Sequence, residues 1–468
     1  MTALPLLEGR PSNEVPLTRG ACRLPPLRRL QLQSLGRPLD LLDDGLCRMR
    51  AFDLLLCVGL AASPGLAAAA CGSAPANRLT TTPTDLAGSM HAYSEDLAVG
   101  RHALESSIVN QANAYSALRL ARYDEHHWEA LAEFDPPTAP MLVGAAGRPA
   151  AAPALGDPSW GALAPDTVGW SLEELTALGE RAFFRYPLQA SATMLAAMST
   201  DDHAGVWAHD GRLGAVWVSL PRGLVLPAFT CATCHASKVG DRLVPGRNNA
   251  DLDAARLYDN GSVDVVTGEA AGDLRILPGW GRGRVDVTPD GIDNPVAITD
   301  LRPVRYQQNL HHAATLHNDP LALAVRIETL IITSHGEAVR PPRKIAAALA
   351  VYLLSLAPTT PLPEGDGAAI FARECGSCHA GEAASGPPVS LAAVGTDPAV
   401  GASPDRGTGR YRVPSLRAVG DRRRMFASGD IADLDALLAP DRAVAGHRYG
   451  LTLDAKDRAA LLAYLRGL

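Results

Sequence analysis

The chain has 468 residues and a formal net charge of −7, with 43 lysines and arginines against 50 aspartates and glutamates. This length is enough for two or three domains, and the acidic balance argues against a nucleic-acid partner, which would need a basic surface. After residue 71 no apolar run is long enough to cross a bilayer, which excludes a chain built on membrane-spanning helices.

The first residues do not read as a folded domain. Residues 1–48 are rich in proline, leucine and arginine without a sustained period, and we interpret them as a non-native extension upstream of a true start at Met49. Met49 and Arg50 are followed by an apolar run, the order found in secretory signal peptides. We therefore predict a signal peptide over residues 49–70.

A candidate lipid attachment site, Cys71, follows the end of the predicted signal peptide. Small residues precede Cys71, and Gly72-Ser73 follow it, which resembles a bacterial lipoprotein processing site. We predict lipidation of Cys71 and export to the periplasm or cell envelope, with membrane contact through the lipid anchor. The alternative is ordinary secretory cleavage near residue 70. Both outcomes place the mature chain in an oxidising compartment.

Helical and linker patterns come next. We predict a helical segment within residues 71–137, ended by Pro136-Pro137. His126 and His127 lie in it and are interpreted as surface histidines rather than metal ligands. Residues 138–168 are rich in alanine, proline and glycine and are predicted to be a linker.

Two short strings carry the chemistry of the chain. Cys-Ala-Thr-Cys-His occupies residues 231–235, and Cys-Gly-Ser-Cys-His occupies residues 375–379. This pattern is the attachment site of haem c: Cys231 and Cys234, or Cys375 and Cys378, would bond one porphyrin. His235 and His379 would then ligate the iron. A zinc ribbon would need the two cysteine pairs closer together, and a thioredoxin-like dithiol does not require the histidine.

A repeated helix pattern surrounds the two strings. Residues 345–356 and 458–468 share Ala-Ala-Leu-x-x-Tyr-Leu-x-x-Leu, a spacing that puts the shared residues on one helix face. Helical patterns also precede each string, at 171–184 and 366–375. A first and a last helix around a haem motif is the layout of a cytochrome c domain. We predict a mainly α fold with cytochrome c-like domains at 169–360 and 361–468, and a small β insertion in the first, around 214–220.

The carboxy-terminal part resembles the bacterial di-haem cytochrome c peroxidase family. The matching strings are Gly-Ala-Ala-Ile-Phe at 367–371, Arg-Val-Pro-Ser-Leu-Arg at 412–417 and Gly-His-Arg-Tyr-Gly-Leu at 446–451. The first module matches through 178–187 and through Gly-Arg-Asn-Asn at 246–249. The family's Phe-Trp-Asp-Gly-Arg string is absent, which puts peroxide turnover in doubt.

The resemblance also implies axial ligands. The family carries an axial methionine where this chain has Met425, so Met425 is the expected partner of His379. For the first haem we select His335, from the loop before the last helix of its module. The other candidates remain open: His311, His312, His317, Met194 and Met198.

A candidate calcium loop lies between the two motifs. Residues 286–294 gather aspartates, a threonine and an asparagine around a glycine, as calcium loops do, but they lack the bidentate glutamate of an EF-hand. Most such strings are turns.

The sequence as a whole predicts an exported di-haem c-type cytochrome that carries electrons. The negative charge suits a basic redox partner protein. The alternative is an oxidoreductase that reduces peroxide at the first haem, with electrons entering through the second.

Overall fold

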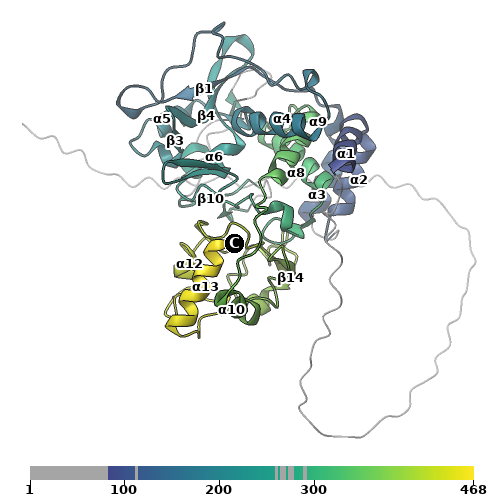
Figure 1. The fold of residues 1–468 in the computed structure, drawn as a ribbon. Helices are drawn as coiled ribbons and strands as arrows, with labels where there is room; N and C mark the ends of the chain where they lie inside the picture. The colour runs from purple at the N-terminus through teal and green to yellow at the C-terminus, as the bar shows by residue number, and fades with distance from the viewer. Residues whose placement is uncertain (1–82, 111–113, 259–261, 264–269, 272–278, 288–291) are drawn as a thin grey trace, which may run out of the picture. The chain divides into compact units, whose positions relative to one another are not determined.

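The computed structural model describes residues 83–110, 114–258, 262–263, 270–271, 279–287 and 292–468 (Figure 1). These described residues belong to one compact unit. The predictions for residues 1–48, for the signal peptide at 49–70 and for Cys71 lie outside the described residues. Within the described ranges, no helix combines the length and apolarity that a membrane crossing requires.

Among the regular elements of the described residues, helices hold more residues than strands do, in line with the predicted mainly α fold, and the sheets are small. Beyond the helices introduced below, short helices are α5 (Thr193–Met198), α6 (Cys231–His235), α7 (Ala254–Tyr258), α11 (Leu391–Val394) and α12 (Leu434–Leu437). Two-stranded sheets pair β6 (Ala236–Val239) with β7 (Arg242–Pro245), β8 (Ser262–Val263) with β9 (Ala270–Ala271), β10 (Arg284–Val285) with β11 (Val296–Ala297), β12 (Asn309–Leu310) with β13 (Leu316–His317), and β14 (Gly386–Ser390) with β15 (Arg410–Val413).

The predicted amino-terminal helical segment contains α1 (Pro83–Glu95), α2 (Leu97–Ser107) and α3 (Ala114–Glu125). The helices α1 and α2 pack on α8 (Pro320–Ser334) and α9 (Arg343–Ser355), which places them against the first module. Helix α8 had not been predicted. It begins with Asp319 as N-cap and Pro320 in its first turn, a start signal that the sequence does contain.

The β insertion is larger than predicted. An antiparallel sheet has the order β1-β4-β5-β2, with β3 pairing β4. Its strands are β1 (Thr138–Leu142), β2 (Gln189–Ala190), β3 (Ala208–His209), β4 (Arg212–Ser219) and β5 (Val225–Phe229). Strand β1 comes from the segment predicted as a linker. The proline- and alanine-rich composition of this segment does not predict a strand. The strand forms because it pairs with β4, beginning at Thr138↔Val218.

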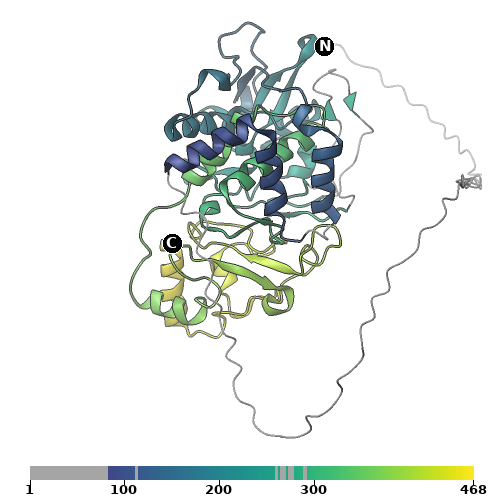
Figure 2. The same cartoon turned by 90° about the vertical axis from the view of Figure 1, so that its right-hand side faces the viewer.

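Two helix pairs cross in the same way, one in each predicted module. Helix α4 (Leu172–Arg185) packs on α9, and α10 (Asp366–Glu374) packs on α13 (Ala455–Gly467) (Figure 1). Figure 2 shows the α10–α13 pair, green and yellow, from a second side. All four helices occur where the sequence predicted them. Ser171 caps α4 through a capping box, and Asp454 caps α13.

The two crossings use equivalent residues. In the first, Gly179 lies against Ala348 and the Tyr352 side chain; in the second, Gly367 lies against Ala460 and the Tyr464 side chain, and each glycine brings the backbones close because it has no Cβ. One helical turn further along, the rings of Phe183 and Tyr352 lie 5.4 Å apart, and those of Phe371 and Tyr464 lie 5.0 Å apart. The repeat read from the sequence is thus a repeated helix contact.

These glycines provide a test of the crossings. Gly179→Ala and Gly367→Ala should each destabilise the protein by about 1–3 kcal/mol, because the new Cβ would meet a backbone carbonyl oxygen across the crossing. Gly88→Ala in α1 is the matched control. Nothing lies within 4 Å of its new Cβ, so helix propensity should raise stability by up to ~1 kcal/mol. Thermal unfolding of the three variants measures this. A Gly179→Ala variant more stable than the wild-type protein would contradict the close approach of the α4 and α9 backbones at this crossing.

Candidate haem-binding sites

The second Cys-x-x-Cys-His string opens onto a large, mainly apolar cavity. Cys375, Cys378 and His379 line it, and so does Met425. The apolar wall comes from strand β14 and from loops and helices of the module, namely Val389, Val394, Val419, Leu434, Leu437, Leu438 and Leu465. A cavity that holds both thiols, a histidine and a thioether within apolar walls has the donor set that haem c requires.

His379 is held in the orientation that a proximal ligand needs. Its Nδ1 lies 3.2 Å from the backbone carbonyl oxygen of Ala384, so Nδ1–H donates and Nε2 keeps its lone pair. Burial lowers the pKa of His379 to about 4, which keeps the ring neutral near pH 7. Burial raises the pKa of the neighbouring Cys375 thiol to about 12. A neutral ring with a free Nε2 is the form that ligates a metal.

Met425 sits on a tight loop beside the same cavity. Its side chain is 8% exposed, and its N–H donates to the carbonyl oxygen of Ile431 at 2.7 Å. The residues on either side, Arg424 and Phe426, have positive φ angles of 58° and 66°. Such backbone is costly for residues other than glycine and persists where surrounding contacts impose it. The structure therefore brings Met425 to the cavity that His379 lines, and its role as an iron ligand stays a prediction.

His447, which is not among the ligand candidates predicted from the sequence, also reaches this cavity. His447 lines it, with its ring centre 6.5 Å from that of His379. Its Nδ1 is buried and makes no hydrogen bond, and its φ of 44° is left-handed. The sequence does point to His447, because this residue belongs to the Gly-His-Arg-Tyr-Gly-Leu string at 446–451 that resembles the peroxidase family.

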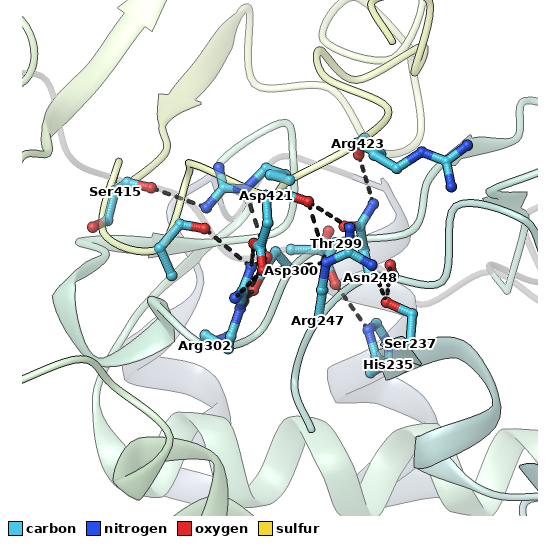
Figure 3. A network of polar contacts seen from close by, with 12 residues as sticks. His235, Ser237, Arg247, Asn248, Thr299, Asp300, Arg302, Ser415, Asp421 and Arg423 are labelled. Atoms are coloured by element: carbon cyan, nitrogen blue, oxygen red, sulfur yellow. Dashed lines mark hydrogen bonds and ion pairs between the residues drawn. The ribbon is translucent and has the colours of Figure 1, made fainter. Parts of the chain in front are cut away.

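The first string shows the same arrangement around its histidine. His235 ends α6, and its Nδ1 lies 2.8 Å from the carbonyl oxygen of Thr299 (Figure 3). Nδ1–H therefore donates, and Nε2 is left available. Burial lowers the pKa of His235 to about 4 and raises those of Cys231 and Cys234 to about 12. The four cysteines of the two strings are free of disulfides.

A methionine-rich core lies beside the first string. Cys234 packs against a cluster that includes Met141, Met194 and Met198, each 0% exposed. Met194 and Met198 were among the sequence candidates for the sixth ligand of the first haem. Met141 was not, because it lies in the segment interpreted as a linker.

The four histidine candidates have different surroundings. His335 follows α8 and packs on Phe134; its Nε2 lies 3.1 Å from the carbonyl oxygen of Pro187, while its buried Nδ1 has no partner. His311 uses both ring nitrogens, toward Thr315 and Arg326. His312 binds the Ala297 carbonyl oxygen and lines the second cavity, and His317 is exposed. The selection of His335 as iron ligand stays a prediction.

One segment, residues 297–300, belongs to both sites. Its Thr299 carbonyl holds His235, while all four residues line the second cavity. The N–H of Ala297 donates to the Ala427 carbonyl oxygen at 2.8 Å, two residues beyond Met425. The segment thus touches the proximal side of the first site and the loop of Met425.

A polar network surrounds this segment (Figure 3). Arg247, from the Gly-Arg-Asn-Asn string, donates to the backbone carbonyl of Asp421 at 2.6 Å, and Asn248 donates to that of Arg423 at 2.7 Å. Arg302 binds the carboxylates of both Asp300 and Asp421, each at 2.6 Å. The string at 246–249 therefore anchors the loop that leads to Met425.

The candidate calcium loop lies partly outside the described residues, which omit 288–291. Asp286 pairs with Arg406 at 3.3 Å and accepts the N–H of Asn294, and Asp293 accepts from the Trp280 indole at 2.7 Å. Across the described ranges, no group of three or more histidine, cysteine, aspartate or glutamate side chains is arranged to hold a metal ion.

Three comparisons bear on these sites. Residues 365–468 match the family model of cytochrome c, so the chain contains a cytochrome c domain. None of the curated proteins matches the chain. Among solved structures, the chain is similar to a MauG-like protein associated with microbial copper homeostasis, at 18% identity over 40% of this chain and 78% of that one. The TM-score of 0.29 is too low for this likeness to bear on fold or function.

Proposed function

We propose that this protein is an exported di-haem c-type cytochrome that transfers electrons. The main support for the proposal is that two histidines, one after each cysteine pair, are held in the same orientation with the same ring nitrogen free. His235 and His379 each follow a cysteine pair, and each rests Nδ1 on a backbone carbonyl so that Nε2 is free. Haem iron, when bound, takes up and releases one electron. The repeated helix crossing and the cytochrome c domain at 365–468 support a haem in each module.

Different residues of the chain would hold each of the two haems. Cys231 and Cys234 would bind the first, and Cys375 and Cys378 the second. For the second haem Met425 is the proposed sixth ligand. For the first haem we favour Met194 or Met198 over His335, because both methionines belong to the core cluster on which Cys234 packs.

The number of haems tests this proposal directly. The full chain, matured in a host that attaches haem c, should carry two covalent haems by intact mass and by haem absorbance. Cys231→Ser/Cys234→Ser and Cys375→Ser/Cys378→Ser should each retain one, because each cysteine pair binds its own porphyrin. Each double variant is the control for the other. If the wild-type protein carries a single haem, the cysteine pair without a covalent haem is not a haem attachment site, and the assignment at that pair is wrong.

Peroxide distinguishes electron transfer from the enzymatic alternative. Methionine ligation on both haems predicts that peroxide leaves the spectra of the oxidised and half-reduced protein unchanged. Peroxide consumption, with a spectral change at the first haem, would instead favour the peroxidase-like oxidoreductase.

Export and lipidation of Cys71 remain part of the proposal, as does a basic partner for the acidic chain. The mass of the mature amino terminus tests the first two: a diacylglyceryl cysteine is expected at residue 71. The rate of electron exchange with a basic partner should fall as salt rises, because salt screens the attraction.

A further inference from the structure

The second cavity has a polar patch in its mainly apolar wall. Gln307, His312, Arg412 and Arg422 line the cavity together with Asp300. Three of them are joined by hydrogen bonds: the Arg412 guanidinium donates to the Gln307 amide oxygen, and the Arg412 backbone N–H donates to the His312 carbonyl oxygen. Two of these residues contact the segment 297–300: His312 through the Ala297 carbonyl oxygen, and Arg422 through Asp300 Oδ2 at 3.8 Å.

Arg412 lacks a counter-charge. Within the described part of the chain its guanidinium pairs with no carboxylate, and Gln307 is its hydrogen-bonding side-chain partner. Burial and the neighbouring Arg422 lower the pKa of Arg412 to about 10. A buried cation with a neutral partner alone is costly, because desolvation is not offset.

Arg422 is also incompletely paired. Its Nε is buried and makes no hydrogen bond, and the nearest carboxylate oxygen is Asp300 Oδ2 at 3.8 Å. That carboxylate is already held by Arg302 at 2.6 Å. The other end of the side chain, Nη2, donates to the Ser415 carbonyl oxygen at 3.2 Å.

The charges of this region leave a surplus. The ion-paired network joins three arginines to two aspartates, namely Arg247, Arg302 and Arg422 with Asp300 and Asp421. One positive charge is left over there, and Arg412 adds another. A surplus of two buried positive charges beside a cavity calls for two anionic groups, and a haem carries two propionates.

We propose that Arg412 and Arg422 hold the propionates of the haem bound at residues 375–379. This inference rests on the proposed function, since it requires that haem. The propionate edge of that haem would then lie at the patch, next to residues 297–300, on the side opposite Cys375 and Cys378. Because Thr299 also holds His235, the propionates would lie beside the segment that orients the histidine of the first string.

Single and double substitutions to glutamine test the proposal on the haem-loaded full chain. In Arg412→Gln and Arg422→Gln, the propionate-bending bands of the resonance Raman spectrum should shift. The midpoint potential of the second haem should fall, because a nearby cation favours the reduced iron. Arg422→Lys should restore the potential in part, since it returns the charge. Arg423→Gln is the matched control, because Arg423 is exposed and pairs with Asp251.

The outcomes separate the two proposals. Loss of covalent haem from 375–379 in the wild-type protein would overturn the proposed function. Haem present at 375–379, with Raman bands and potential unchanged in both glutamine variants, would overturn the propionate assignment alone. If the double variant fails to load haem, the single variants and Arg422→Lys provide the same readouts.

Discussion

Replacing Met425 with alanine should lower the midpoint potential of the haem at 375–379. A thioether stabilises the reduced iron, so its loss favours the oxidised state, and axial ligands set potentials over a span of about 0.8 V. The fall should be a substantial part of that span and should be accompanied by loss of the spectral signature of methionine ligation. A spectroelectrochemical titration of the full chain measures both.

Met90→Ala is the matched control for this prediction. Met90 is fully buried in a different core cluster, on α1, so its loss should reduce stability and leave both potentials unchanged. An unchanged potential in Met425→Ala would mean that another side chain ligates the iron. His447 would then be the next candidate, because it lines the same cavity and has a buried, unpartnered Nδ1.

Arg343→Leu should produce the largest loss of stability outside the haem sites. Arg343 on α9 binds Glu328 on α8 at 3.2 Å and the Tyr123 hydroxyl at 2.7 Å, while the Tyr93 hydroxyl donates to Glu328 at 2.6 Å. The Glu328 side chain is fully buried. Removing Arg343 would leave that carboxylate without a cation, at a cost of about 3–5 kcal/mol in the free energy of unfolding.

Two further variants define the origin of this effect. Glu328→Leu/Arg343→Leu removes both charges and should recover much of the lost stability, because no buried ion is left unpaired. Arg101→Ala breaks an exposed pair with Asp124 and should have a much smaller effect, since water screens that pair. A double variant that is less stable than Arg343→Leu would contradict the explanation. Chemical denaturation measures all three.

Much of the helical framework follows from local patterns. The helices at 172–185, 343–355, 366–374 and 455–467 occur where periodicity and capping residues predicted them. Helix α8 was missed because it is apolar on several sides, with Leu323, Val325 and Ile331 all buried, so it shows no amphipathic period. Strand β1 was missed because a strand in a proline- and alanine-rich stretch depends on its partner rather than on its own residues.

The sequence by itself determined the two Cys-x-x-Cys-His motifs, which place thiols and imidazole within about one helical turn. It also determined the repeated crossing helices, through a spacing of three and four residues. Only the tertiary structure decided what surrounds these motifs. The acceptor of His235 is 64 residues away, and the Arg247–Asp421 contact joins residues 174 apart. Such contacts depend on how modules pack, which local spacing does not encode, and so does the placement of Arg412 and Arg422 beside the second cavity.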